Sequence, residues 1–82
     1  MDKSHPEHTD LMGEPLHIGD VVITSYTGTT IQLAKVEKFH PVMITLISYR
    51  DRGWRGKFRR YPHETLKVSK EKVVEFLLRE GV

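Results

Sequence analysis

Residues 42–61 read VMITLISYRDRGWRGKFRRY, and this stretch predicts a β-hairpin. Apolar side chains occupy both alternating faces of residues 42–49, which is typical of a strand that is covered on both sides. Residues 50–53 form a polar four-residue turn, in which Gly53 can adopt a positive φ. Residues 54–61 then return as a second strand, in which basic and aromatic side chains are interleaved.

The sequence on either side of this hairpin predicts three further strands and a helix. Proline cannot donate to a β-ladder, so Pro41 ends the strand that precedes the hairpin. Apolar residues recur at helical spacing after Ser69, which is a suitable N-cap, and Gly81 provides a stop signal. The expected elements are strands over residues 21–26, 29–39 and 66–69, a tight turn over 61–65 and a helix over 70–80.

Length and composition bound the class of protein. The chain has 82 residues, enough for one domain, and we expect a disordered tail over residues 1–12 and a single domain over residues 13–82. The absence of cysteine excludes disulfides and thiolate metal sites. No apolar run is long enough to cross a bilayer, and the N-terminal residues lack the apolar region of a signal peptide. We therefore expect a cytoplasmic protein, monomeric or weakly dimeric, without a metal, a cofactor or a membrane partner.

Two segments carry a resemblance to a known fold family. Residues 18–23, IGDVVI, and residues 59–68, RRYPHETLKV, are similar to the opening and closing segments of SH3-like small barrels, the KOW and Tudor-like group. The resemblance covers residues 17–69 and implies a mostly β fold, a five-stranded SH3-like barrel with a short 3-10 turn over residues 61–65. The C-terminal α-helix is an addition to that pattern. SH3-like barrels include nucleic-acid binders, peptide readers and adaptors, so the resemblance implies a fold and leaves the function open.

Positive charge is concentrated in one short segment of the chain. Residues 1–49 carry a net charge of −3 and residues 61–82 a net charge of zero, whereas residues 50–60 carry six basic groups and one acidic group. Arginine predominates there, and guanidinium groups bind phosphates through two hydrogen bonds and stack on bases. The candidate binding residues are the six cations and two aromatic residues that could stack on bases if exposed, namely Arg50, Arg52, Trp54, Arg55, Lys57, Arg59, Arg60 and Tyr61.

Strand geometry predicts where these side chains point. Side chains alternate along a regular strand, which would send Trp54, Gly56 and Phe58 into the core and Arg55, Lys57 and Arg59 outside. Strict alternation would also bury Arg60, which is too costly for an unpaired guanidinium. We therefore expect a bulge, or the end of regular pairing, near Arg59 and Arg60. Gly56 is a second position that is consistent with a bulge or a close backbone approach.

The basic segment favours a small nucleic-acid-binding protein. Phosphate contacts position a protein on DNA or RNA without reading the bases, so low sequence specificity is expected. The alternative is an interaction module, an adaptor or small inhibitor, including a virally encoded one, that binds an acidic surface of a larger protein. Two other readings are that the charges blunt an exposed sheet edge, and that aromatic residues form a cage for a methylated side chain.

No catalytic motif accompanies the basic segment. His63 and Glu64 begin a zinc-protease pattern, but Lys67 stands where its second histidine is required. The sequence contains neither a GxSxG elbow nor a phosphate-binding P-loop. We therefore expect that the protein is not an enzyme.

Overall fold

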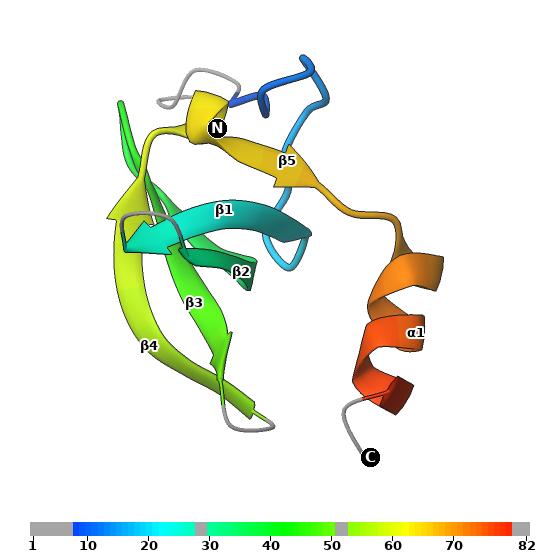
Figure 1. Ribbon diagram of the computed structural model, residues 1–82. Helices are drawn as coiled ribbons and strands as arrows, with labels where there is room; N and C mark the ends of the chain where they lie inside the picture. Colours follow the sequence, from blue (N-terminus) through cyan, green and yellow to red (C-terminus); the bar gives the residue numbers. More distant parts are fainter. Residues whose placement is uncertain (1–7, 28–29, 51–52, 80–82) are drawn as a thin grey trace.

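The computed structural model describes residues 8–27, 30–50 and 53–79 of the chain. These residues form one antiparallel sheet of five strands, a short 3-10 helix and a C-terminal α-helix (Figure 1). The mostly β class and both helical elements expected from the sequence are confirmed. The elements are β1 (Val21–Thr27), β2 (Thr30–Phe39), β3 (Ile44–Arg50), β4 (Gly53–Arg60), η1 (Pro62–Glu64), β5 (Thr65–Lys67) and α1 (Lys70–Arg79).

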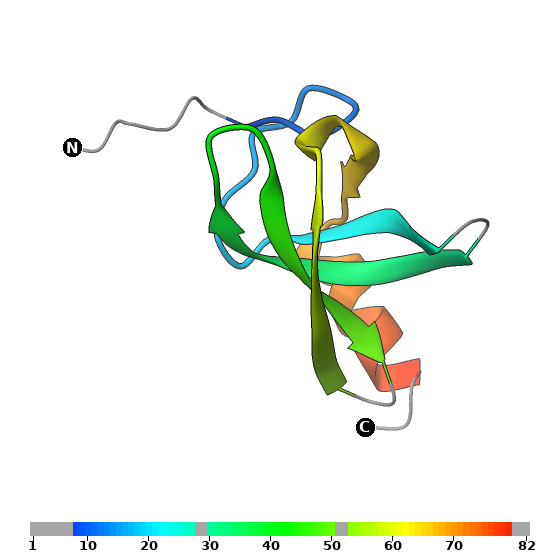
Figure 2. The same ribbon diagram turned by 90° about the vertical axis from the view of Figure 1, so that its left-hand side faces the viewer.

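The strand order in the sheet is β4-β3-β2-β1-β5. Strands β1 to β4 pair with their neighbours in sequence, and β5 then returns to pair with β1 at the other side of the sheet. Figures 1 and 2 show that the strands twist strongly, so that β4 crosses the direction of β1 and β2. Among the described residues no ladder joins β4 to β5, so the sheet is not closed between its two boundary strands.

The hydrophobic core lies on one face of the sheet, which we call the inner face. Side chains alternate between the two faces of a strand, and β3 shows this period clearly. Ile44, Leu46 and Ser48 are buried, whereas Thr45 and Ile47 are only partly buried on the opposite, outer face. The apolar core consists of Leu16, Val22, Ala34, Val36, Ile44 and Leu46, with Phe39 and Phe58 at its border.

The expectation that residues 1–12 form a disordered tail is wrong from residue 8 onward. Residues 8–16 cover the edge of β5 that does not pair with β1, where the backbone N–H of Leu11 donates to the carbonyl of Thr65 at 2.8 Å. The low hydrophobicity of residues 8–15 suggested disorder, but polar contacts hold these residues in place, and Leu16 at the end of the segment is buried in the core. Residues 1–7 lie outside the described residues, so the expectation is not tested there.

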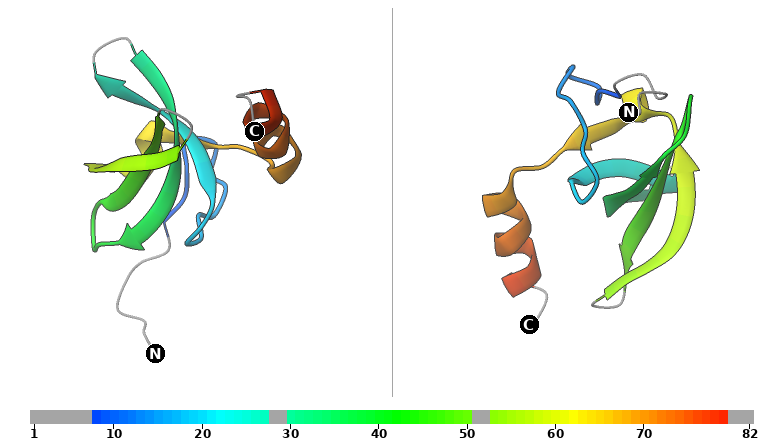
Figure 3. Two further views of the ribbon diagram at one scale, coloured as in Figure 1. Left: turned by 90° about the horizontal axis from the view of Figure 1, so that it is seen from below. Right: turned by 180° about the vertical axis from the view of Figure 1, so that it is seen from behind.

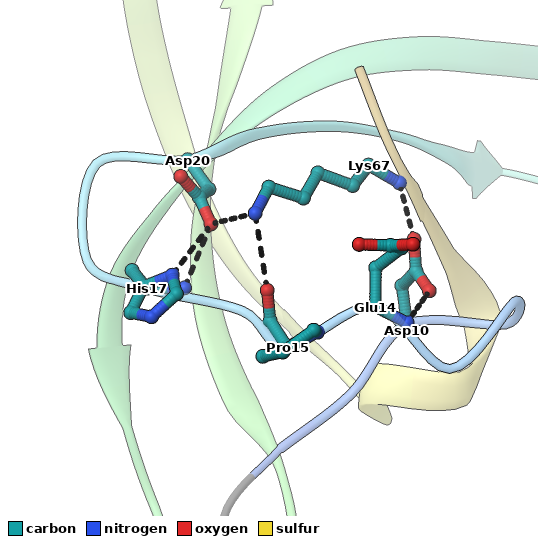
Figure 4. A network of polar contacts seen from close by, with 6 residues as sticks. All are labelled: Asp10, Glu14, Pro15, His17, Asp20 and Lys67. Carbon is teal, nitrogen blue, oxygen red and sulfur yellow. Dashed lines mark hydrogen bonds and ion pairs between the residues drawn. The ribbon is translucent and has the colours of Figure 1, made fainter. Parts of the chain in front are cut away.

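Asp10 is the centre of these polar contacts (Figure 4). The residue is only 4% exposed, and its two carboxylate oxygens accept the backbone N–H groups of Met12 (2.9 Å), Glu14 (2.8 Å) and Lys67 (2.7 Å). Burial alone would raise the pKa of the Asp10 carboxyl group. The three N–H donors and the nearby charge of Lys67 outweigh burial and lower the pKa below its usual value. The charged carboxylate therefore belongs to the folded state.

A second carboxylate links the start of β1 to β5. Asp20 accepts the backbone N–H of His17 at 2.8 Å, and its Oδ2 lies 3.2 Å from Nζ of Lys67 (Figure 4). The same Nζ donates to the carbonyl of Pro15 at 3.1 Å. Burial would raise the pKa of Asp20, but these hydrogen bonds and charges lower it. One lysine thus joins the N-terminal segment, β1 and β5.

The helix α1 stands beside the sheet rather than in its core (Figure 3). None of its side chains is buried, and the ring of Phe76 meets the ring of Tyr49 on β3 with centroids 5.3 Å apart. Ser69 is the N-cap, as expected, because its Oγ accepts the N–H of Lys72 at 3.3 Å. Val74 and Leu78 remain 55% and 66% exposed. The helix therefore adds little to the core.

Candidate functional site

Strand β4 contains a β-bulge at Gly56. Ile47 on β3 lies opposite Lys57, whereas the next residue, Ser48, lies opposite Arg55, so Gly56 is an extra residue in the ladder. Its φ is 75°, a conformation that glycine adopts readily. The sequence had suggested a bulge at Gly56, and this expectation is confirmed. The positive φ expected at Gly53 is not observed, because Gly53 is the first residue of β4 and pairs with Arg50.

The bulge changes which side chains share a face. Residues directly opposite each other on paired strands point to the same side of the sheet. The expected ladder of Arg55, Lys57 and Arg59 on a single face is therefore wrong, because the extra residue breaks the alternation. The register places Trp54, Lys57 and Arg59 on the outer face, and Arg55, Phe58 and Arg60 on the side of the core.

Strand β2 contains a second irregularity, at Glu37. Val36 lies opposite Leu46 and Lys38 lies opposite Thr45, so Glu37 is the extra residue. In a regular strand without a bulge, Lys38 would share the face of buried Val36. The bulge at Glu37 instead places Lys38 opposite Thr45 on the outer face, the same face as Lys35. The imperfect alternation of this strand is visible in the sequence, whereas the bulge that causes it is defined only by the pairing with β3.

The two irregularities flank β3 and gather positive charge on the outer face. One row across β2, β3 and β4 reads Lys38, Thr45, Arg59, and the next reads Lys35, Ile47, Lys57. Neighbouring cations lie roughly 7 Å apart along a strand and roughly 10 Å apart across β3. We call Lys35, Lys38, Lys57 and Arg59 the outer basic face. Two of the four, Lys35 and Lys38, were not among the residues that the sequence singled out.

The cations of this face have different surroundings. Nζ of Lys57 lies 3.1 Å from Oε2 of Glu37, so one cation already has a carboxylate partner. Nζ of Lys35 lies 5.0 Å from the centre of the Trp54 ring. Lys38 and Arg59 are exposed and have no ion-pair partner within the described part of the chain.

The two aromatic candidates occupy different places. Trp54 is partly buried on the outer face, where it forms a T-shaped pair with Tyr49, with centroids 5.0 Å apart, and its ring lies beneath Lys35. Trp54 thereby belongs to a cluster of rings that continues to Phe76 on α1. Tyr61 lies beyond the end of β4, is 41% exposed and stacks on His63 with centroids 5.5 Å apart. The structure does not bring the two rings together.

Three further predicted cations, Arg50, Arg55 and Arg60, lie away from the outer basic face. Strand β4 ends at Arg60, which agrees with the expected end of regular pairing near Arg59 and Arg60. The Arg60 guanidinium donates to the carbonyls of Ser25 (3.0 Å) and Arg59 (2.7 Å). It also lies 4.9 Å from the centre of the Phe58 ring. These contacts explain how a cation is tolerated in register with the core.

Arg50 and Arg55 are exposed at the other end of the hairpin. The backbone carbonyl of Arg55 accepts a hydrogen bond from Oγ of buried Ser48 at 2.6 Å. Arg52 lies outside the described residues. Of the five predicted cations that the structure describes, it thus brings only Lys57 and Arg59 together on the outer face.

A cavity of 410 Å³ lies between α1 and the sheet, lined by residues that include Val21, Val68, Val73 and Val74. Within residues 8–27, 30–50 and 53–79, no group of three or more His, Asp or Glu side chains could hold a metal ion. No helix in this part of the chain is long and apolar enough to cross a membrane.

Fold and site together define a small, mostly β domain with an open five-stranded sheet and a basic outer face. A family model described as a domain of unknown function (DUF7205) matches residues 8–70, and the chain belongs to this family. The match begins in the segment that covers β5 and ends at the first residue of α1. Comparisons with curated proteins and with solved structures gave no significant match.

Proposed function

We propose that the protein binds nucleic acid, DNA or RNA, through the outer basic face, with little sequence specificity and without catalysis. The observation that carries this proposal is the pair of bulges at Glu37 and Gly56 on either side of β3. The first puts Lys38 on the face of Lys35, and the second puts Trp54 on the face of Lys57 and Arg59. Bulges commonly re-aim side chains at functional sites.

The spacing of the cations supports phosphate binding rather than base reading. Four cations over an area of roughly 7 by 10 Å can contact neighbouring phosphates of one strand. Phosphate contacts carry no sequence information, so the affinity should depend strongly on salt and weakly on sequence. Only Arg59 among the four can form the two-pronged guanidinium contact. The face therefore suits loose, non-specific binding.

Charge reversal on this face tests the proposal. Fluorescence anisotropy would measure binding of labelled single- and double-stranded DNA and RNA at 50 and 200 mM salt. A Lys38→Glu, Arg59→Glu variant should lose at least tenfold in affinity. The matched control, Arg50→Glu with Arg55→Glu, changes the net charge equally but at exposed residues whose register is on the other side of the sheet, and should lose much less. Equal losses in both variants, or no binding by the wild type, would reject the proposal.

We also propose that the sheet has the SH3-like arrangement. The return of β5 to β1 after a 3-10 turn supports it, as does the hydrogen bond that links the end of β4 to the carbonyl of Ser25 on β1. Protection of the Arg60 guanidinium protons from exchange in solution would test this contact.

An interaction module that binds an acidic protein surface is the second candidate function. An apolar row beside the outer basic face favours it, since Leu66, Ile23 and Leu33 lie opposite one another on β5, β1 and β2. Leu66 and Ile23 are 39% and 38% exposed, and nearby Ile31 is 70% exposed. A mixed apolar and basic surface fits a protein partner. Such a module would ignore nucleic acid at moderate salt and would lose its partner on Ile31→Asp.

A further inference from the structure

A carboxylate lies among the cations of the outer basic face. Glu37 is the residue that the β2 bulge inserts, and its Oε2 is 3.1 Å from Nζ of Lys57. The side chains of Glu37 and Lys57 are 36% and 66% exposed. Exposed ion pairs contribute little to folding stability, so the fold does not require this pair. The consequence of the pair is for the ligand of the face.

We propose that Glu37 withholds Lys57 from phosphate, so that the face binds nucleic acid with three cations instead of four. This inference rests on the function proposed above. To bind phosphate, Lys57 would have to leave one anion for another, and the phosphate would have to approach Glu37. Both effects oppose the fourth contact. Lys35, Lys38 and Arg59 carry no such penalty, because no carboxylate is paired with them among the described residues.

The number of engaged cations can be read from the salt dependence of binding. For duplex DNA, the logarithm of affinity falls with the logarithm of salt with a slope of about −0.9 per neutralised phosphate. Three contacts therefore give a slope of about −2.7, and four give a slope of about −3.6. At 50 mM salt, one further contact of this kind corresponds to roughly tenfold tighter binding.

The experiment compares the wild type with Glu37→Gln on a labelled 20-base-pair DNA duplex between 50 and 200 mM salt. Glutamine keeps the size of the side chain but removes its charge, so Lys57 becomes available. We expect the slope to steepen by about one unit and the affinity at 50 mM salt to rise about tenfold. A Glu37→Gln, Lys57→Gln variant should return to the wild-type slope, because the released cation is gone.

Glu75→Gln is the matched control, because it also frees a lysine from an exposed ion pair, Lys72 with Glu75 at 3.6 Å on α1. It raises the net charge by the same amount but lies on another element, and should change the affinity less than twofold. A wild type that binds, with Glu37→Gln unchanged or no tighter than Glu75→Gln, would overturn this inference and leave the proposed function intact. If neither the wild type nor Glu37→Gln binds this duplex or any of the single- and double-stranded DNA and RNA probes named above, the proposed function fails and this inference fails with it.

Discussion

Replacing Asp10 with alanine should destabilise the whole domain, because it removes the acceptor of three backbone N–H groups. The donors of Met12 and Glu14 belong to exposed residues and can bind water instead, so each loss costs about 0.5–1 kcal/mol. The N–H of Lys67 is left without its partner on a strand whose outer edge is covered by the N-terminal segment. Its loss costs about 1–3 kcal/mol. The sum is about 2–5 kcal/mol, a large share of the stability of a small domain.

Urea unfolding, followed by far-UV circular dichroism and by the fluorescence of Trp54, measures this loss. In a separate thermal unfolding experiment, the melting temperature of a domain of this size should fall by about 10 °C or more. Glu14→Ala is the control, because the carboxylate of Glu14 is exposed and only its backbone N–H bonds to Asp10. This control should cost less than about 0.5 kcal/mol. A loss below 1 kcal/mol for Asp10→Ala would refute the argument that this carboxylate is a main support of residues 8–15 on the sheet.

Three further predictions follow from the same structure. The lowered pKa values of Asp10 and Asp20 mean that their stabilising contribution is complete above the unfolded value near 3.8 and is lost as pH falls through the lower folded values. Acid titration of stability should therefore be shallower in Asp10→Asn. Gly56→Ala should cost about 1–2 kcal/mol through its positive φ, with Ser48 Oγ only 3.3 Å from the added carbon. Gly53→Ala, in ordinary strand conformation, should be nearly neutral in the same denaturation assay. Phe76→Ala should reduce helical dichroism while urea unfolding of the sheet changes by less than about 1 kcal/mol, because α1 has no buried side chain.

The sequence predicts the strands well because their apolar period is local. Alternation along β3 and the proline after β2 identify these elements within a few residues, and Ser69 identifies the start of α1. The side of the sheet to which a given cation points cannot be predicted in the same way, because it depends on the register with a neighbouring strand. One extra residue, Gly56, moves Arg55 to the other side of the sheet.

The contributions of Lys38 and Asp10 could not be predicted for the same reason. The outward position of Lys38 follows from the irregularity at Glu37, which is defined only by the pairing with Leu46 and Thr45. Asp10 looks like a residue of a polar tail until Lys67, far along the chain, supplies the N–H that it accepts. Long-range partners, rather than local composition, decide both cases.

The covered edge of β5 makes the molecule asymmetric with respect to sheet growth. Residues 8–16 cover the free edge of β5, so among the described strands β4 is the one along which another chain could extend the sheet. If two copies met there in antiparallel fashion, each would present Lys57 and Arg59 to the same residues of the other. Mutual repulsion would oppose such edge-to-edge dimerisation, and the cations of β4 would help to keep the protein dispersed at low ionic strength.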